Sequence, residues 1–352
     1  MRITKIKGTV PMSFLLFAGL IAYSQTANAG DLEPTAPPAP TMKTLEEVEA
    51  RTPINAEDLP LTISGSGSYY LVEDISFSTS GVNGITITAD DVTVDLNGFK
   101  LDGPGMGTTG NGITNPISGD ISGAVVVNGT ISNWRHGVSL EGTGNKVREV
   151  TVRNNTGYGI VVGNQSLVSG CFAFNNGDAG VAAGSDSMVR DCVSRDNEIF
   201  RVSLWYGNGI EVEQGCTVMG CRVSSNKVNG ISADDDSIVM NCTASHNEGN
   251  GIFIRSGRVV NCTAAHNDTQ GIQAEDGSLI TDNLLDRNDI GIRLDGEGSV
   301  IRANHFTLNA TTGLNVFSEN NYSAQNTFHE NGTDINGAHK QGTGEMANIM
   351  IP

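Results

Sequence analysis

Basic side chains are scarce in this chain. Its 352 residues include 21 Lys and Arg against 39 Asp and Glu, which gives a formal net charge of −18 at pH 7. Nucleic acids and anionic membranes are bound largely through basic contacts, so this balance argues against both as partners. It also argues against unaided binding of polyuronates, because like charges repel. Such acidity is usual for exported proteins that rely on charge for solubility.

A long hydrophobic run is also missing. The main apolar stretch, residues 12–23, is too short to span a membrane. It follows three basic residues and precedes Ala27-Asn28-Ala29, which is the pattern of a secretory signal peptide. We therefore expect cleavage after Ala29 and a protein that is secreted, periplasmic or held at the cell surface.

Composition divides the rest of the chain. Residues 33–40 contain four prolines and predict a linker that holds no regular ladder. Residues 44–51 carry Thr44 and Glu47 at capping-box spacing, and predict a short helix that covers one end of the repeats. The expected divisions are a signal peptide at 1–29, a linker and N-terminal capping segment at 30–60, a repeat domain at 61–335 and a C-terminal tail at 336–352.

The repeats lack the dense leucine of leucine-rich repeats and the Gly- and Asp-rich nonapeptide of calcium-bound β-rolls. Two other markers recur, about every 21 residues. The first is a Gly followed by Ile, Val or Leu, at Gly137, Gly159, Gly180, Gly209, Gly230, Gly251, Gly271, Gly291 and Gly313. The second is an Asn that closes a short apolar run, at Asn155, Asn176, Asn197, Asn226, Asn247, Asn267, Asn288, Asn309 and Asn331.

Between the markers, apolar and variable residues alternate in runs too short for a helix, as in Ile231-Ser232-Ala233. This pattern predicts an all-β, right-handed parallel β-helix, in which equivalent residues stack in columns about 4.8 Å apart. Counting Gly84 and Gly112, we expect about eleven coils. Asn suits such columns because its amide hydrogen-bonds along the stack and because it tolerates the left-handed backbone of a sharp turn.

Asp95-Leu96-Asn97-Gly98 opens an apolar strand, and with these coils it resembles the pectin-lyase-like superfamily of right-handed β-helices, especially secreted bacterial repeat proteins. The likeness covers roughly residues 60–335 and implies the fold. The superfamily's catalytic motifs are not assembled. Arg135-His136-Gly137 departs from the Gly-His-Gly of polygalacturonases, and the basic cluster of pectate lyases and the Asp-Pro-His-Asp of alginate epimerases are missing. The resemblance therefore supplies no catalytic residue.

All six cysteines fall inside the repeats. One column contains Cys171, Cys192, Cys221, Cys242 and Cys262 and continues as Asn283, Asn304 and Asn326. Cys216 stands where other coils have Ser or Gly. Small interior residues in a column predict buried free thiols. A disulfide between neighbouring coils is the alternative, because the rung spacing lies within the range that a disulfide spans.

The repeat is interrupted once by an aromatic insertion, between Asn197 and Gly209. It contains Trp205 and Tyr206. Insertions in solenoids become loops on one face, often the binding face. Trp205 and Tyr206 are therefore candidate substrate-binding residues that would lie against a sugar ring. The alternative is that they fold onto the flank of the solenoid.

The strand after the insertion carries Glu211 and Glu213, which alternation places on the outer face. They are candidate catalytic residues, because paired carboxylates supply acid and base in glycosidases. Glu213, Asp234 and Asp235 are the candidate ligands of Ca²⁺, which prefers carboxylate oxygens. Arg255 lies in the same column and is a candidate substrate-binding residue. The alternative for all of them is a ladder of surface ion pairs.

These observations predict an exported β-helix that interacts with an extracellular or cell-wall carbohydrate, with Ca²⁺ as a possible cofactor. A polysaccharide or cell-surface glycan is the expected partner. Two alternatives stay open: a polysaccharide lyase, hydrolase or epimerase of the pectin-lyase-like type, and a structural or adhesive surface rod. Binding of a glycan distinguishes the first two readings from the third.

Overall fold

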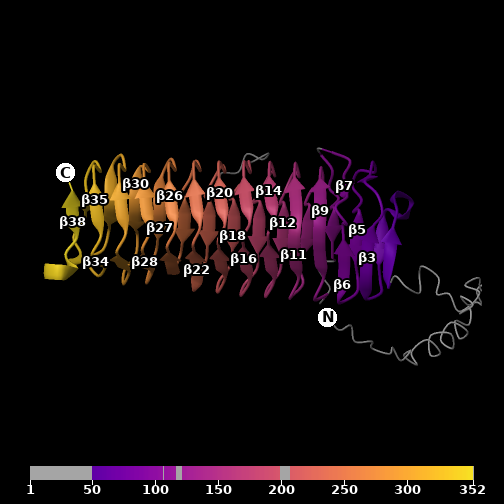
Figure 1. Cartoon of the computed structure of the whole chain (residues 1–352), viewed down its shortest axis with the longest axis horizontal. Coiled ribbons are helices and arrows are strands. Elements are labelled where there is room, and N and C mark those ends of the chain that lie inside the picture. Colours follow the sequence, from indigo (N-terminus) through magenta and orange to yellow (C-terminus); the bar gives the residue numbers. More distant parts are fainter. Residues whose placement is uncertain (1–49, 106, 116–120, 199–206, 352) are drawn as a thin grey trace, which may run out of the picture. The chain divides into compact units, whose positions relative to one another are not determined.

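The computed structural model describes residues 50–105, 107–115, 121–198 and 207–351. From Arg51 onward they form a parallel β-helix whose successive coils stack along one axis (Figure 1). Each regular coil supplies three short strands, such as β12 (Ile160–Val162), β13 (Leu167–Ser169) and β14 (Phe172–Phe174). The only helical segments in these ranges are two 3-10 turns, η2 (Ala56–Asp58) and η3 (Gly344–Met346). The predicted β-helix is confirmed, and the leucine-rich repeat is excluded.

One side of the solenoid is a 13-stranded sheet, called here the 13-strand sheet, in which every pair is parallel. β12 belongs to this sheet. The other strands are β2 (Leu61–Ile63), β5 (Ile85–Ile87), β8 (Ile113–Thr114), β10 (Val138–Leu140), β15 (Val181–Ala183), β18 (Ile210–Val212), β21 (Ile231–Ala233), β24 (Ile252–Ile254), β27 (Gln270–Ala274), β30 (Ile290–Leu294), β33 (Thr312–Val316) and β36 (Ile335–Asn336).

The other strands form a 25-stranded parallel sheet, the 25-strand sheet, which bends around the remaining sides. At its N-terminal end are β1 (Arg51–Ile54), β3 (Gly67–Leu71), β4 (Ile75–Ser76), β6 (Val92–Asp95), β7 (Lys100–Asp102), β9 (Val125–Ser132) and β11 (Lys146–Arg153). After β13 and β14 come β16 (Met188–Arg190), β17 (Val193–Arg195), β19 (Thr217–Met219), β20 (Arg222–Ser224), β22 (Ser237–Met240), β23 (Thr243–Ser245), β25 (Gly257–Val260), β26 (Thr263–Ala265), β28 (Leu279–Thr281), β29 (Leu284–Asp286), β31 (Val300–Arg302), β32 (His305–Thr307), β34 (Tyr322–Ala324), β35 (Thr327–His329), β37 (Lys340–Gln341) and β38 (Ile349–Ile351).

The solenoid has more coils than the sequence predicts. The 13-strand sheet alone exceeds the expected count of about eleven. The markers miss both ends, because β2 follows Pro60 and β36 follows Asp334 where the other coils have Gly. Paired strands also lie outside residues 61–335, since β1 pairs with β3 and β38 with β35. Most of the predicted capping helix lies outside the described residues, and its last position, Arg51, begins β1.

The recurring Gly is required by close packing between coils. A Cβ placed on Gly230 would lie 2.6 Å from the carbonyl oxygen of Gly251 and 2.7 Å from the side-chain nitrogen of Asn247. Both distances are shorter than real Cβ contacts allow. The Gly column therefore makes room for the Asn column, which explains why the two sequence markers keep step.

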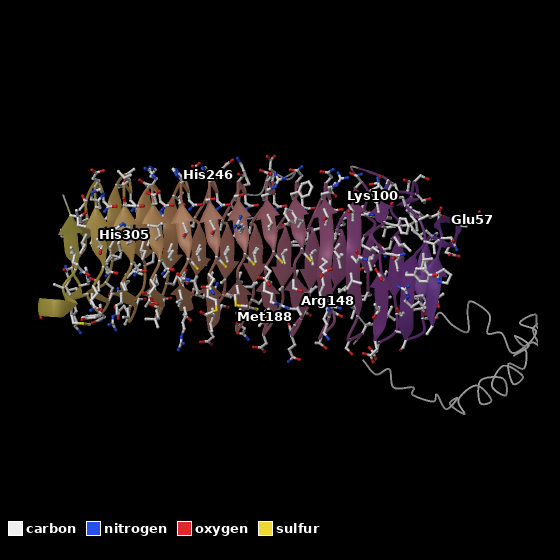
Figure 2. All side chains as sticks on the ribbon, viewed as in Figure 1. Glu57, Lys100, Arg148, Met188, His246 and His305 are labelled. Carbon is white, nitrogen blue, oxygen red and sulfur yellow. The ribbon has the colours of Figure 1, made fainter. Side chains whose placement is uncertain are left out.

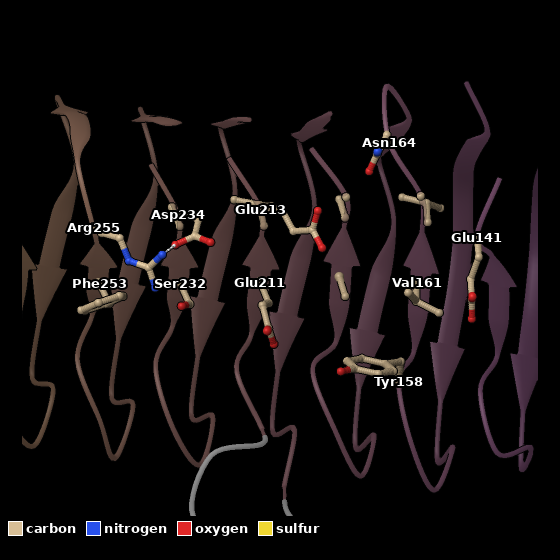
Figure 3. A pocket seen from close by; sticks show the side chains of 17 residues that line it. Glu141, Tyr158, Val161, Asn164, Glu211, Glu213, Ser232, Asp234, Phe253 and Arg255 are labelled. Carbon is tan, nitrogen blue, oxygen red and sulfur yellow. Dashed lines mark ion pairs between the residues drawn. The ribbon is translucent and has the colours of Figure 1, made fainter. Parts of the chain in front are cut away.

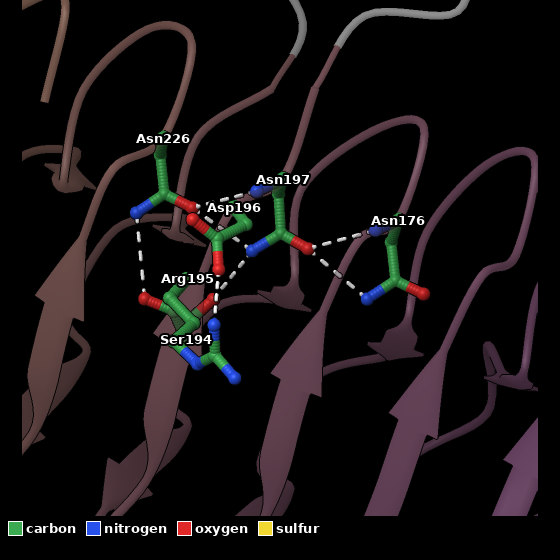
Figure 4. Close-up of polar contacts among 6 residues, drawn as sticks. All are labelled: Asn176, Ser194, Arg195, Asp196, Asn197 and Asn226. Carbon is green, nitrogen blue, oxygen red and sulfur yellow. Dashed lines mark hydrogen bonds and ion pairs between the residues drawn. The ribbon is translucent and has the colours of Figure 1, made fainter.

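The Asn column forms a continuous hydrogen-bonded ladder inside the turn, as the sequence predicts. The Asn176 amide donates to the Asn197 side-chain oxygen at 3.0 Å, and the Asn197 amide donates to that of Asn226 at 2.9 Å (Figure 4). Each of these oxygens also accepts the backbone N–H of the preceding Asn. The left-handed backbone, however, belongs to the residue before each ladder Asn, such as His246 at φ 57°. That part of the prediction is wrong.

The predicted cysteine column is confirmed: all six thiols are free and buried. The rows of side chains repeat from coil to coil (Figure 2). The backbone N–H of Cys242 donates to Cys262 Sγ at 3.4 Å, and that of Cys262 donates to the Asn283 side-chain oxygen at 2.8 Å. A Cys sulfur therefore takes the position of an Asn oxygen in one ladder. Burial raises the pKa of the Cys216 thiol, so it stays protonated and unreactive.

Candidate functional site

The middle residue of each three-residue strand in the 13-strand sheet faces outward and stacks on its equivalents in the neighbouring coils. Around β18 this column runs Val161, Ala182, Glu211, Ser232 and Phe253. Ala182 and Ser232, on either side of Glu211, are small compared with Phe253, and a groove of about 490 Å³ runs along the sheet here (Figure 3). We call this hollow the β18 groove. A groove of this size is in the range of small-molecule sites.

Two aromatic rings, Tyr158 and Phe253, line the β18 groove. Figure 3 shows them on opposite sides of Glu211. Phe253 is the outward residue of β24, and Tyr158 belongs to the turn that precedes β12. Both are half-buried. Our sequence reasoning missed them, although Phe253 stands at the variable position of its repeat, where comparison with small neighbours in the same column would have found it.

Glu211 lies within the groove and is only partly exposed. The side-chain amide of Asn208 donates to its carboxylate at 3.3 Å. Burial raises the pKa of Glu211, and the negative charges of Asp234 and Glu213 add to the rise, while the Asn208 hydrogen bond opposes it. A carboxyl group of this kind holds its proton at higher pH than an ordinary Glu, which suits a proton donor.

Glu213 follows β18 at the rim of the same groove and is exposed. Its carboxylate accepts the Ser185 hydroxyl at 2.9 Å. Figure 3 shows the carboxylates of Glu211 and Glu213 pointing in different directions. The two predicted catalytic residues therefore share one groove but have different partners and different exposure.

The ion pairs expected around Arg255 are present. Its guanidinium lies 2.7 Å from a carboxylate oxygen of Asp234, 3.6 Å from one of Glu275 and 3.8 Å from one of Asp235. The Arg255 side chain is half exposed, so each pair contributes at most about 1 kcal/mol. Since three carboxylates surround it, Arg255 adds little positive charge to the groove, and the groove as a whole is acidic.

The predicted calcium ligands do not converge on one point. Asp234 and Asp235 both contact Arg255, while Glu213 bonds to Ser185. Within the described residues, no three His, Cys, Asp or Glu side chains are grouped so that they could hold a metal ion. A guanidinium at this position repels a cation. The arrangement therefore does not fit a preformed calcium site, and calcium binding by these residues stays a prediction.

Trp205 and Tyr206 lie outside the described residues, as does the rest of 199–206. The residues on either side belong to the solenoid: the Glu198 N–H donates to the Asn176 carbonyl, and the Gly207 carbonyl accepts the Val228 N–H. The assignment of Trp205 and Tyr206 to substrate binding stays a prediction. In the ranges that the structure covers, no helix is long and apolar enough to cross a membrane.

Comparison with known proteins agrees with the stacked parallel coils. The family described as "Right handed beta helix region" matches residues 83–237 and 208–345, so the chain belongs to the right-handed β-helix family. No curated protein matches its sequence.

Several solved structures resemble this chain at low sequence identity. The A-module of the mannuronan C-5 epimerase AlgE6 from Azotobacter vinelandii is 12% identical with a TM-score of 0.60, covering 82% of this chain and 91% of that one. The periplasmic alginate epimerase AlgG is 12% identical with a TM-score of 0.46, covering 85% and 84%. Pectate lyase Pel9A is 14% identical with a TM-score of 0.43, covering 83% and 73%. At 12% identity the likeness to the AlgE6 A-module shows the fold alone.

Proposed function

We propose that this protein binds an extracellular polysaccharide in the β18 groove. The observation that carries the proposal is the pair of rings, Tyr158 and Phe253, on either side of hydrogen-bonding groups in an open groove. Sugar rings have apolar faces that pack on aromatic planes and hydroxyl edges that need polar partners. The epimerase module that shares the fold is named for mannuronan, a polyuronate, so it supports a polysaccharide as the broad class of ligand and says nothing of a neutral sugar.

The charge of the β18 groove favours a neutral or amino sugar over a uronate. Four carboxylates line it, from Glu141, Glu211, Glu213 and Asp234. Its one basic lining residue, Arg255, is already paired with carboxylates. A uronate would bring a further negative charge into this field, which is unfavourable without a compensating cation. Calcium, if bound here, would supply that cation, so calcium assistance is a separate and testable part of the proposal.

A catalytic role is the second candidate function, and the environment of Glu211 favours it. A carboxyl with a raised pKa beside a second carboxylate can act as general acid while Glu213 acts as base or nucleophile. Such a pair would make the protein a glycoside hydrolase. If turnover is found, Glu211→Gln should abolish it while sugar binding is retained, because glutamine keeps the shape and loses the proton.

We also propose that the protein acts outside the cytoplasm: it is secreted, or it lies in the periplasm or at the cell surface. The signal-peptide pattern of residues 1–29 supports this. A structural or adhesive rod is the remaining alternative, and it requires no ligand in the β18 groove.

The test is a glycan array of neutral, amino and uronic oligosaccharides, probed with the wild-type protein and with Phe253→Ala. The matched control is Phe172→Ala, which removes an exposed ring from the 25-strand sheet. Phe253→Ala should weaken binding by about 1–3 kcal/mol, which is the usual contribution of an apolar anchor. Phe172→Ala should leave binding unchanged. Equal binding by all three proteins would reject the groove, and no binding by the wild type would favour the rod.

A further inference from the structure

A second pocket, lined only by polar and charged residues, lies beside the β18 groove on the same sheet. Its volume is about 350 Å³. Its floor is a column of hydroxyls, Thr86, Thr114 and Ser139, which are paired in register on β5, β8 and β10. Glu141 lines both this pocket and the β18 groove, so the two hollows adjoin. We call it the β8 pocket.

Two buried polar atoms of the β8 pocket have no hydrogen-bond partner among the described residues. They are Asn111 Oδ1 and Asn115 Nδ2. Asn115 is 2% exposed. A buried polar group without a partner costs about 1–3 kcal/mol, so such groups in a pocket point to a ligand or to ordered water.

The orientation of both amides is fixed by their other contacts. Asn115 Oδ1 accepts the backbone N–H of Glu141 at 2.8 Å, so its Nδ2 is the group left free as a donor. The Thr114 hydroxyl donates its proton to the backbone carbonyl of Asn115 at 3.1 Å and accepts a hydrogen bond from Asn111 Nδ2 at 3.4 Å. Asn111 Oδ1 is therefore the acceptor left free. The pocket presents one unused donor and one unused acceptor.

His136 and Arg135 contribute further donors to the β8 pocket. His136 Nδ1 accepts the backbone N–H of Tyr158 at 2.9 Å, which places the ring proton on Nε2. Burial, with a smaller effect of the Arg135 charge, lowers the pKa of His136 to about 4. His136 is therefore neutral at pH 7, and the lining contains one basic and one acidic side chain, Arg135 and Glu141.

We propose that the β8 pocket is a second sugar subsite that binds one uncharged sugar ring through adjacent hydroxyls. Each hydroxyl both donates and accepts, so a pair of them can satisfy Asn115 Nδ2 and Asn111 Oδ1 together. An ionised carboxylate offers acceptors only, so it cannot satisfy Asn111 Oδ1. The inference rests on the proposed function, because it takes the same glycan to occupy the β18 groove. A glycan that fills both hollows runs along the solenoid axis, past Glu141.

The test compares disaccharides with hexasaccharides of the neutral glycans on the array, using a variant that fills the β8 pocket. Thr86→Tyr places a ring on the pocket floor at an outward, half-exposed position of β5. The matched control is Thr243→Tyr, at an outward position of β23 in the 25-strand sheet. Thr86→Tyr should weaken hexasaccharide binding at least tenfold and leave disaccharide binding in the β18 groove unchanged. Thr243→Tyr should change neither.

A second variant keeps the pocket open. Asn115→Asp retains the oxygen that accepts from Glu141 and replaces the free donor by an acceptor, so it should also weaken hexasaccharide binding. It keeps the test decisive if Thr86→Tyr does not fold.

The outcomes separate this inference from the proposed function. Hexasaccharide binding that depends on Phe253 but is unchanged in Thr86→Tyr and Asn115→Asp overturns the subsite, leaves the proposed function standing and assigns the β8 pocket to ordered water. Hexasaccharide binding that depends on Thr86 and Asn115 but not on Phe253 supports the subsite and overturns the β18 groove. No binding by the wild type overturns both.

Discussion

The Asn ladder should carry a large share of the stability of its coil, and Asn247→Ala tests this. Asn247 is fully buried. Its side-chain oxygen accepts the Asn226 backbone N–H at 3.1 Å and the Asn226 amide at 3.0 Å, and its own amide donates to Asn267 at 2.9 Å. Alanine removes all of these hydrogen bonds and leaves the buried backbone N–H of Asn226 without an acceptor.

The size of the loss follows from these contacts. The two side-chain hydrogen bonds contribute about 1 kcal/mol each and the buried N–H left unsatisfied costs about 1–3 kcal/mol, so the free energy of unfolding should fall by about 3–5 kcal/mol. Two partners stay satisfied: the Asn226 amide keeps the Ser194 carbonyl at 3.4 Å, and Asn267 keeps the Asn247 backbone N–H. They limit the loss to this range.

Urea unfolding followed by circular dichroism measures the change. The control is Asn320→Ala, at an exposed Asn whose amide contacts Glu297 at the surface. It should change stability by less than about 0.5 kcal/mol. A loss below about 1 kcal/mol for Asn247→Ala would refute the view that the ladder stabilises the coils.

Four further predictions concern the thiol column, pH, metal and processing. Cys242→Asp should destabilise the fold severely, because it buries an unpaired charge. Cys242→Asn should be tolerated, because Asn283 already continues the same ladder. Thermal melts of the two variants measure the difference. The raised pKa of Glu211 means that the folded state holds this proton more tightly than the unfolded state, so ionisation lowers stability as pH rises through that pKa. Glu211→Gln should therefore be more stable than wild type at pH 7 and lose the advantage below about pH 4, where both forms are neutral. Millimolar Ca²⁺ should raise the melting temperature, and Asp234→Ala should abolish the rise, if the predicted ligands bind it; an unchanged melt leaves Asp234 with only its ion pair to Arg255. Mass spectrometry of exported protein should find a mature N-terminus at Gly30, and retention of Met1 would contradict the signal peptide.

The repeat architecture could be predicted because its causes are local and periodic. Gly230 must be Gly because the next coil passes close by, and Asn247 must be polar because it bonds to its own equivalents. Where every coil makes the same contact, every coil needs the same residue at that position, and the sequence shows a repeat. The cysteine column was predictable for this reason, whereas the ion pairs of Arg255 were predictable because the period places it between acidic residues of the neighbouring coils. The coils at the ends were missed because they have only one neighbour and so escape the constraint.

The candidate site could be predicted only in part, because a groove depends on differences between coils. Glu211 and Glu213 were found from strand alternation, but alternation does not say that their carboxylates take different partners. The groove exists because Ala182 and Ser232 are small beside Phe253, and that contrast is visible only when one column is read across coils. The β8 pocket is set by the fixed orientation of amides such as Asn115, which no sequence pattern encodes.

The most direct test of the central claim is a crystal structure of the protein with a neutral oligosaccharide identified on the array. The account predicts a sugar ring in the β18 groove, between Tyr158 and Phe253 and within hydrogen-bonding distance of Glu211. A sugar bound on the 25-strand sheet, with the β18 groove empty, would contradict it.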